Sequence, residues 1–575
     1  MDDVPRSKIF DDIYFSVEDG LAESQFVFLK GNDLPERLEG RSQFTVAETG
    51  FGTGLNFLAL WDLIENHAPA LKLHYISYEK FPLTTEDIEQ ALSRWKHVFG
   101  NKIDQMLAQY PLRVEGFHST YLAPNIKLTL VFGDVNETIL KTQNIAVDAW
   151  FLDGFTPAKN PQMWTETLFD NMARLSALKA SFATFTAAGD VKRGLMAAGF
   201  EVEKTQGFGR KRDRLIGCFG GAGAHIPELP QSVAIIGAGI AGCSIAHWLA
   251  QEGVKVRIFE QGLAPAQGAS GNPAGMVNPR FYKLRCEEGH FYWSAYARAL
   301  QFYEALSHEH DVGFEKCGAL HLCTNEDKQD RFQGLLENWD YPDDVSELLS
   351  YDEAKEIAGI ETHTQALYLP NSARVSPHKL CQALTQNIAV TYGFDLPPLE
   401  QLRHGESWHI DGDNFDVLVL AVGAGFDEIE ALQALAESQK LKKVRGQLSQ
   451  ARATDKSEQL TSTAHYGGYI LPAEEGVHVI GSTFQPWETS TDLRSDDDVH
   501  NKEKLAEALP ELAEGLDLTS YRASLRVSSR AYFPVFGKVE DGLYVSLAHG
   551  SHGLTSTPKV AQMLFNPLEK TNNCL

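Results

Sequence analysis

Two glycine-rich turns are the stretches of this 575-residue chain whose residue types and spacing could bind nucleotides. The first lies in VAETGFGTGLNF (46–57), and the second lies in VAIIGAGIAGCS (233–244). Each follows a strand-like run and precedes a helix-like one, so its backbone N–H groups can approach the charged part of a ligand. The glycine spacing differs between the two turns, which predicts two different cofactors.

In the first turn an acidic residue precedes the glycines. The pattern is Glu48-x-Gly50-x-Gly52-x-Gly54-x-Asn56. Glu79 and Asp134 end the next strand-like runs, YISYE and LVFGD. This order resembles the class I S-adenosylmethionine-dependent methyltransferases. The resemblance implies S-adenosylmethionine as cofactor, with Glu79 at the ribose hydroxyls and Asp134 beside the adenine.

A fourth strand-like run ends at Asp153, in DGFTPAKNPQMW. This stretch resembles a variant of the Asp/Asn-Pro-Pro-aromatic element of amino-methyltransferases, which implies that Phe155 and Pro157 lie at the cofactor. In a methyl transfer, a carboxylate at Asp153 could hold the acceptor amine or take up its proton. The alternative is that Asp153 only caps the following turn, as aspartate often does.

The second turn has the dinucleotide spacing Gly237-x-Gly239-x-x-Gly242, and Glu260 ends the next strand, where it can bind a ribose. Two later stretches favour FAD over NAD. QGASGNPAGMVNPR (267–280) could pass under a flavin ring, and LYVSLAHGSHGLT (543–555) ends the chain on another glycine turn and helix. The flavin-contacting residues predicted with these stretches are Ala269, Ser270, Gly271, Gly275, Met276, Gly423, Gly550, Gly553, Leu554 and Thr555.

These features resemble the D-amino acid oxidase and glycine oxidase family, in which an arginine holds the substrate carboxylate. In SLRVSSRAYFPVFG the matching position is Arg526, with Arg530 nearby. A bidentate guanidinium suits a carboxylate, although a salt bridge at a domain edge is the alternative. Ala531 stands where many relatives have an acidic residue, so no role of that acid carries over. Tyr469 is a further substrate-site candidate, or a packing aromatic on a strand.

The formal net charge is −26, so any nucleic-acid contact requires locally gathered cations. Arg210, Lys211 and Arg212 form such a run, which is either a phosphate-contacting edge or a solvated loop. No metal site is predicted, since His549 and His552 have no acidic or cysteine partner close in sequence. Seven cysteines without a CxxC pair suit the reducing cytoplasm, and no membrane span is expected.

The predicted fold is α/β throughout. Residues 1–222 form a Rossmann-like class I methyltransferase domain, and 223–231, rich in glycine and proline, form a linker. Residues 232–575 form an FAD-binding domain of the glycine oxidase type with an inserted mixed β-sheet for the substrate. We expect a cytoplasmic monomer, because each domain would carry its own site.

The order of the two fingerprints, the linker, DGFTPAKNPQMW and GFGRKRDR resemble the bifunctional tRNA 5-methylaminomethyl-2-thiouridine biosynthesis family over nearly the whole chain. The resemblance implies tRNA as partner and two steps on its wobble uridine. The FAD domain would oxidatively remove a carboxymethyl group from the amine, and the other domain would then methylate that amine.

Two alternatives stay open from the residues alone. One is a fused amine oxidase of the glycine or sarcosine type and a metabolite methyltransferase, acting on small molecules. The other is a binding protein that keeps both cofactor folds as a scaffold. The first predicts turnover of free amino acids without the steep salt dependence of phosphate contacts.

Overall fold

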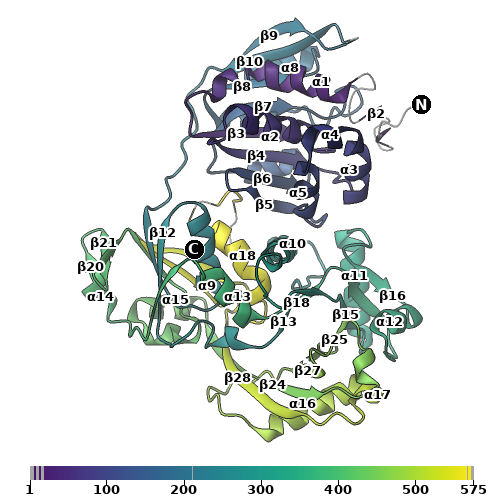
Figure 1. The fold of residues 1–575 in the computed structure, drawn as a ribbon, viewed down its shortest axis with the longest axis vertical. Helices are drawn as coiled ribbons and strands as arrows, with labels where there is room; N and C mark the ends of the chain where they lie inside the picture. Colours follow the sequence, from purple (N-terminus) through teal and green to yellow (C-terminus); the bar gives the residue numbers. More distant parts are fainter. Residues whose placement is uncertain (1–5, 8–11, 14–18, 210, 566, 571–575) are drawn as a thin grey trace. The chain divides into compact units, whose positions relative to one another are not determined.

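A computed structural model describes all residues except 1–5, 8–11, 14–18, 210, 566 and 571–575. Their contacts divide the chain into two compact units. Of the described residues, the first unit contains those up to Glu228 and a short C-terminal piece, 567–570, and the second contains Leu229–Phe565. Both units are drawn in Figure 1, where the first is purple to blue.

The first unit is built on an eight-stranded sheet. In order across the sheet the strands are β5 (Gly116–Ala123), β6 (Ile126–Phe132), β4 (Lys72–Glu79), β3 (Gln43–Thr49), β7 (Val147–Leu152), β8 (Ser176–Thr184), β10 (Asp213–Phe219) and β9 (Phe200–Gln206). The five central strands β6, β4, β3, β7 and β8 are parallel, while β5, β10 and β9 pair antiparallel with their neighbours. Parallel strands present their carboxyl ends at one edge, so that edge collects the residues that follow them.

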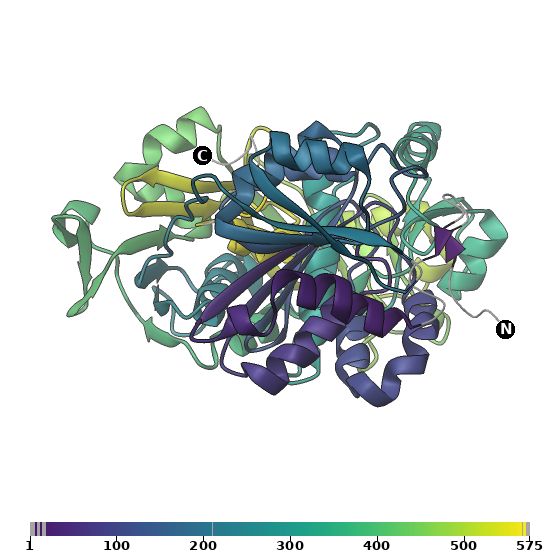
Figure 2. The same cartoon turned by 90° about the horizontal axis from the view of Figure 1, so that it is seen from above.

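Helices cover both faces of this sheet, as Figure 2 shows. They are α1 (Gly20–Ser24), the π-helix η1 (Gln25–Leu29), α2 (Leu55–His67), α3 (Thr85–Leu92), α4 (Lys96–Phe99) and α5 (Lys102–Ala108), then α6 (Val135–Lys141), α7 (Glu166–Leu175) and α8 (Gly189–Ala197). Alternate residues of β3 serve the two cores: Val46 packs with Phe57 of α2, and Ala47 packs in the core that holds Leu168 of α7. The buried central strands are thus apolar on both faces.

A short C-terminal segment packs on the first unit. Glu569 bridges to Thr142, the backbone N–H of Gln143 donates to the carbonyl of Leu568 at 2.9 Å, and that of Lys570 donates to Lys141 at 2.7 Å. The chain therefore returns to its first unit after the last helix of the second.

The second unit contains a six-stranded sheet that carries the second glycine turn. Its order is β19 (Ala389–Tyr392), β12 (Lys255–Glu260), β11 (Ser232–Ile236), β23 (Val417–Leu420), β30 (Leu543–Leu547) and β29 (Val535–Glu540), and only β29 runs antiparallel. The helices α9 (Ile240–Gln251), α10 (Glu287–Ser307), α13 (Pro377–Thr385) and α18 (Gly553–Met563) pack against one another beside it. The other face packs on α14 (Leu399–Leu402), α15 (Gln433–Ser438) and the hairpin sheet β20 (Arg403–His404), β21 (Ser407–Ile410) and β22 (Asp413–Phe415).

A second, mixed sheet of eight strands is inserted between strands of the first. Its order is β16 (Glu347–Leu349), β17 (Ala366–Leu369), β15 (Ala319–Leu322), β25 (Thr463–His465), β26 (Tyr469–Ile470), β27 (Val477–Gly481), β24 (Lys442–Arg452) and β28 (Thr519–Ser528). Helices α12 (Tyr351–Ala358), α16 (Ser495–Ala508) and α17 (Pro510–Ala513) share one apolar core with it. Near it lie α11 (Glu326–Trp339) and the small sheet of β13 (Gly275–Val277), β18 (Ala373–Val375) and β14 (Glu315–Lys316).

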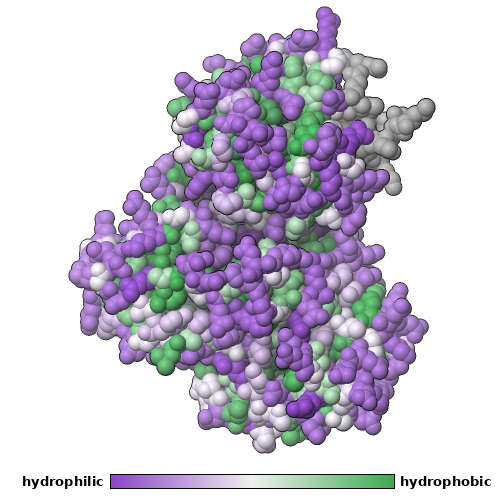
Figure 3. All heavy atoms as spheres, viewed as in Figure 1, coloured by the Kyte–Doolittle hydropathy of each residue, from purple (hydrophilic) through white to green (hydrophobic). Residues whose placement is uncertain are grey.

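The visible surface is mainly hydrophilic, with scattered hydrophobic residues (Figure 3). Among the described residues, no helix combines the length and the apolar character that crossing a membrane requires.

Candidate active sites

The first glycine turn joins β3 to α2 in a conformation that favours glycine. The φ angles of Gly50, Gly52 and Gly54 are 87°, 53° and 79°, a region that other residues rarely adopt. A Cβ atom on Gly50 would lie 3.3 Å from the Cα of Gly154. The turn therefore runs close to the end of β7, where Asp153 lies.

Asn56 joins two carboxylates at this edge of the sheet. Its Nδ2 donates to Glu48 Oε1 at 2.9 Å and to Asp153 Oδ2 at 2.8 Å. Ser24 holds the other end of the amide by donating from Oγ to Asn56 Oδ1 at 2.6 Å. Ser77 Oγ donates to Glu48 Oε2 at 2.7 Å. The structure thus brings Glu48, Asn56 and Asp153 together into one hydrogen-bonded cluster.

Both carboxyl groups have raised pKa values. Burial, followed by the neighbouring charge of Asp153, raises the pKa of Glu48 to about 8. Burial also raises the pKa of Asp153 to about 7, although hydrogen bonds from the Gly154 amide and Asn56 oppose the shift. A carboxyl group that titrates near neutral pH can accept a proton from an amine during the reaction.

Glu79 and Asp134 lie at neighbouring strand ends but make different contacts. Glu79 accepts hydrogen bonds from the amide of Gly52 at 3.0 Å and from that of Phe81 at 2.7 Å, so it is tied to the glycine turn. Burial raises its pKa. Asp134 caps α6 by accepting from the Asn136 amide at 2.9 Å and pairs with Lys80 at 2.8 Å. Burial opposes ionisation of Asp134, but these partners leave its pKa lowered.

The loop after β7 holds the remaining predicted contacts of this site. Phe155 and Pro157 are partly exposed in it. Thr156 between them donates through both its amide and its Oγ1 to Asp12 Oδ2, at 3.1 and 2.9 Å. The side chain of Met163 closes over Gly154, where a Cβ would come within 2.6 Å of its Cε. The loop is thereby held against the glycine turn.

The basic run separates into different environments. Lys211 Nζ pairs with Glu23 at 2.8 Å, lies 4.5 Å from the Phe185 ring centroid, and lowers the pKa of Asp153. Arg212 is exposed, and Arg210 lies outside the described residues. Lys211 therefore belongs to the surroundings of Asp153, while Arg212 remains a candidate for phosphate contact.

The second glycine turn joins β11 to α9 and leaves no room for a side chain at Gly237 or Gly242. A Cβ on Gly237 would lie 2.5 Å from the carbonyl oxygen of Ala421, and one on Gly242 would lie 2.0 Å from that of Gly237. Glu260 accepts from the amides of Ala238 at 2.6 Å and Gly262 at 2.7 Å. These contacts place the turn and the Glu260 carboxylate beside each other, as a ribose site requires.

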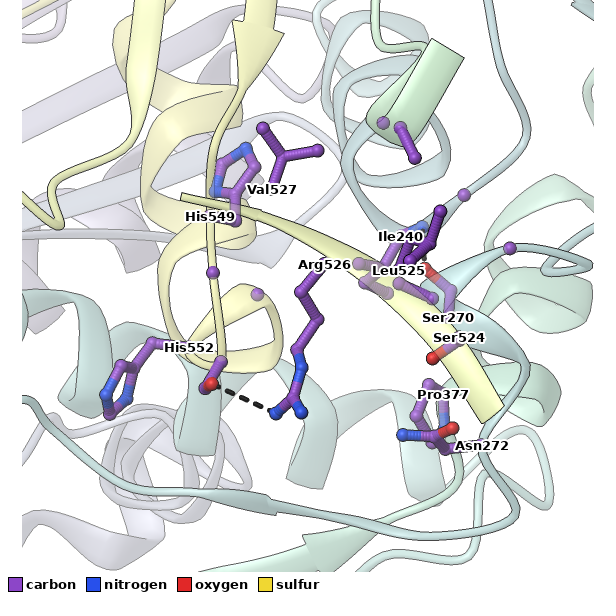
Figure 4. A pocket seen from close by; sticks show the side chains of 18 of the residues that line it. Ile240, Ser270, Asn272, Pro377, Ser524, Leu525, Arg526, Val527, His549 and His552 are labelled. Carbon is purple, nitrogen blue, oxygen red and sulfur yellow. Dashed lines mark hydrogen bonds between the residues drawn. The ribbon is translucent and has the colours of Figure 1, made fainter. Parts of the chain in front are cut away.

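The turn opens on a cavity of about 1480 Å³. The predicted residues that line it are Gly237, Gly239, Glu260, Ala269, Ser270, Gly275, Met276, Gly423, Tyr469, Arg526, Gly550, Gly553 and Leu554. The start of α18 faces this cavity, so its backbone N–H groups and dipole are directed to a ligand there. Figure 4 shows the turn before α18 opposite Arg526 of β28.

Four predicted residues lie outside the cavity lining. Gly242 packs α9 on its strand, and a Cβ on Gly271 would meet the guanidinium of Arg522 at 2.4 Å. Thr555 is buried and donates from Oγ1 to the Asn278 carbonyl at 2.7 Å. Arg530 is exposed on the turn after β28. The first three support the walls of the cavity without facing its interior.

Arg526 lines the cavity, and its hydrogen-bond partners within the described part of the chain are all neutral. Its Nη1 donates to Ser551 Oγ at 3.1 Å, and its Nη2 donates to Ser482 Oγ at 3.0 Å and to the Thr483 carbonyl at 3.1 Å. Gly446 leaves room for it, since a Cβ there would lie 1.8 Å from Nη2. Burial lowers the pKa of Arg526, which is the effect of a charge without an anion beside it. A substrate carboxylate would supply that anion.

Tyr469 and His549 line the same cavity as this guanidinium but have different surroundings. Burial raises the pKa of Tyr469 to about 12 although Arg526 opposes the shift, so the phenol is neutral and close to the arginine. His549 hydrogen-bonds Ser556 Oγ through Nδ1 at 2.8 Å and Ser546 Oγ through Nε2 at 3.0 Å. Both of its ring nitrogens are therefore engaged by serines.

Several site residues carry no sequence signal. Glu23 and Phe185 come to Asp153 from outside any motif, and Gly446 is an isolated glycine in a strand. His321 and His465 line the FAD-type cavity from neighbouring strands 144 positions apart. Only the pairing of those strands brings them together.

Both sites fit the expected cofactors by observations of their own. The first has a glycine turn with three positive φ angles against a buried carboxylate, which suits the amino-acid part of S-adenosylmethionine. The second has side-chain-free turn positions, a carboxylate at the next strand end and a helix N-terminus at one cavity, which suits FAD.

Family models match both units. Residues 97–219 match the S-adenosyl-L-methionine-dependent methyltransferase model, and residues 232–566 match the FAD dependent oxidoreductase model. The two cofactor predictions and the predicted fold class are confirmed. Among solved structures, glycine oxidases from Bacillus cereus and Geobacillus kaustophilus share the fold of the second unit. Each covers 60% of this chain and 96% of its own, with TM-score 0.51 and 23% and 22% identity respectively.

Curated relatives match nearly the whole chain. A tRNA 5-methylaminomethyl-2-thiouridine biosynthesis bifunctional protein MnmC from Methylobacillus flagellatus is 37% identical over 97% of this chain and 90% of its own length. The protein of the same name from Idiomarina loihiensis is 38% identical over 98% and 94%. With both domain models in the order of the two sites, the chain belongs to the family of MnmC bifunctional tRNA 5-methylaminomethyl-2-thiouridine biosynthesis proteins.

Proposed function

We propose that the two units perform consecutive steps on the wobble uridine of tRNA. The second unit oxidises a 5-carboxymethylaminomethyl group to an aminomethyl group, and the first unit methylates the resulting amine. The charges at the two sites carry this proposal: Arg526 has no anionic partner among the described residues, and Asp153, held by Asn56, offers a carboxylate to an amine. The first substrate bears a carboxylate and the second bears an amine.

In the oxidation, Arg526 would bind the carboxylate and orient the adjacent C–H bond toward the flavin. Bound FAD supplies the acceptor for the hydride. Loss of the hydride from carbon and of the proton from nitrogen leaves an imine. Addition of water then releases glyoxylate and leaves the aminomethyl group. Tyr469, neutral beside Arg526, would lend its hydroxyl to the same carboxylate.

In the methylation, Asp153 would accept the proton that the amine gives up. The amine nitrogen must be neutral to attack the methyl group of S-adenosylmethionine. With its pKa near 7, Asp153 is ionised in a large fraction of molecules at neutral pH. Asn56 keeps the carboxylate in place through its 2.8 Å hydrogen bond. The new N–CH3 bond forms as the sulfonium C–S bond breaks.

The proposal also covers the remaining assignments. Residues 1–222 and 232–575 would be the two catalytic domains, acting in the cytoplasm as a monomer. Arg212 would contact tRNA phosphates. The same role is proposed for Arg210 on the basis of the sequence, because it belongs to the same basic run.

Nucleoside mass spectrometry tests both steps. Purified protein is added to tRNA that carries the 5-carboxymethylaminomethyl wobble base, with and without S-adenosylmethionine. We expect aminomethyl product without the methyl donor and methylaminomethyl product with it. Unchanged tRNA in both tubes, together with oxidation of free glycine or sarcosine, would favour the small-molecule enzyme pair instead.

A further inference from the structure

Two stacked imidazoles form part of the wall of the FAD-type cavity. His321 of β15 and His465 of β25 face each other across parallel strands, with ring centroids 4.3 Å apart and ring planes at 8°. Both line the cavity. Neither histidine takes part in the oxidation derived above, and neither belongs to a motif.

The hydrogen-bonding capacity of both rings is unused. The Nε2 atom of each is buried without a partner, and neither ring makes a hydrogen bond within the described part of the chain. Burial lowers the pKa of His465 to about 3 and that of His321 well below its usual value, so both rings are neutral. An unpaired buried N–H is more costly than an unpaired lone pair, which assigns the proton of each ring to Nδ1. Each ring then has one N–H donor to offer.

The neighbours of the pair extend a single polar wall. The ring of Tyr469 lies 5.9 Å from that of His465, and Tyr469 is in turn close enough to Arg526 for the guanidinium to lower its pKa. Lys328 and Arg331 of α11 line the same cavity, and their positive charges contribute to the lowered pKa of His321. A carboxylate-binding end, flat neutral donors and two cations thus follow one another along the cavity.

We propose that His321 and His465 form the subsite that binds the uracil ring of the substrate nucleoside, with Lys328 and Arg331 beside its flanking phosphate. Neutral N–H donors match the carbonyl oxygens of a pyrimidine base. The amine of a small amino acid needs no such donors. Cations match a phosphate. This inference rests on the proposed function, because it names the part of that substrate which the oxidase unit recognises.

Two ligands separate base recognition from carboxylate recognition. The flavin-loaded protein is titrated with 5-carboxymethyluridine and with acetate, and binding is followed through the perturbation of flavin absorbance. The variants are His321→Phe, His465→Phe and the double variant, which keep a flat ring and remove the donors. His404→Phe, on the exposed β20–β21 hairpin, is the matched control.

We expect each single variant to weaken nucleoside binding by ~2–10-fold and the double variant by roughly 10–100-fold, from the loss of one or two hydrogen bonds. Acetate binding should stay within twofold. Should the double variant not fold, His465→Phe carries the test, since that ring is only partly buried.

Three outcomes would overturn the subsite. Unchanged nucleoside binding would show that the donors do not meet the base. Parallel weakening of both ligands, or an altered flavin spectrum before any ligand is added, would assign the pair to the flavin or to Arg526. Failure of the proposed function is a separate result, in which wild-type protein leaves the modified tRNA unoxidised in the mass-spectrometric experiment.

Discussion

Asp153 in the first unit and Arg526 in the second are both partly buried, and both are hydrogen-bonded by neutral groups. Asp153 accepts from an amide side chain and a backbone amide, and Arg526 donates to two hydroxyls and a carbonyl. The pKa of the carboxyl is raised and that of the guanidinium is lowered, each by burial. Among the residues that the structure describes, neither charge has a direct partner of opposite sign, and the two charges differ in sign.

This difference explains how one chain can act twice on one group. The unit with the unpaired cation suits a substrate that carries a carboxylate. The unit with the raised-pKa carboxylates suits the same group once the carboxylate has been removed and an amine remains. If Arg526 and Asp153 have the roles proposed above, charge complementarity accounts for the order of the two steps.

Of the predicted changes in activity, the largest should come from replacing Arg526. Truncating one partner of a desolvated charge pair costs about 2–5 kcal/mol, which is roughly a 30- to 5000-fold loss. We expect Arg526→Ala to lower kcat/KM for oxidation of carboxymethylaminomethyl tRNA within that range and to leave methylation of aminomethyl tRNA unchanged. Arg452→Ala, an exposed arginine of the same sheet, is the control. An unchanged kcat/KM would place the carboxylate elsewhere.

Replacing Asp153 should produce the mirror image. Asp153→Asn keeps the shape but removes the proton acceptor, and positioned proton transfer contributes typically about 10²–10⁴-fold. We expect methylation to fall by roughly that factor while oxidation persists. In wild-type protein, methylation should fall about tenfold per unit below pH 7, because the pKa of Asp153 is about 7 and its protonated form cannot accept a proton.

That acid limb should be absent from the residual activity of Asp153→Asn. Asp190→Asn, at an exposed position on α8, is the matched control. Methylation at the wild-type rate in Asp153→Asn would reduce Asp153 to a turn-capping residue.

A smaller effect concerns stability. The pKa of Glu48 is raised to about 8 in the folded protein, so the folded state holds a proton that the unfolded chain has lost between about pH 5 and pH 8. Stability is therefore lost as pH rises through this window. We expect Glu48→Gln to flatten the dependence of stability on pH and to melt above wild type at pH 8.5. The expected rise in Tm is about 2–4 °C for each kcal/mol of unfolding free energy gained in a unit of this size.

Thermal unfolding at several pH values measures this shift. The transition of the first unit is identified as the one whose midpoint moves when S-adenosylhomocysteine is added. Glu203→Gln, on the exposed side of β9, should leave the pH dependence as it is. Parallel curves for Glu48→Gln and wild type would mean that Glu48 ionises in the folded protein as it does in the unfolded chain.

Much of the first site was predictable because its residues follow parallel strands. Glu48, Glu79, Asp134 and Asp153 each end a strand-like run, and the carboxyl ends of parallel strands meet at one edge. The basic run shows the limit of this reasoning. The sequence pattern does not distinguish Lys211 from Arg212. In the fold, Lys211 pairs with Glu23 and Arg212 is exposed to solvent.

The second site shows the same limit at longer range. The glycine turn and Glu260 lie within one strand–helix–strand unit, so a short window of sequence contains them. The stacked pair of His321 and His465 depends on β15 pairing with β25, and the neutral partners of Arg526 come from the turns after β27 and β30. Such pairings are set by sheet order, which no local pattern encodes.

By itself the sequence determined the two cofactor turns, the acidic strand ends and the order of the two domains, since these depend on neighbours a few positions apart. The tertiary structure alone decided that Asn56 joins Glu48 to Asp153, that the described partners of Arg526 are neutral, and that residues 567–570 return to the first unit. The reason is physical: burial and long-range contacts set the charge state of a side chain and which of its donors and acceptors stay unpaired. Both arise only when distant segments pack together.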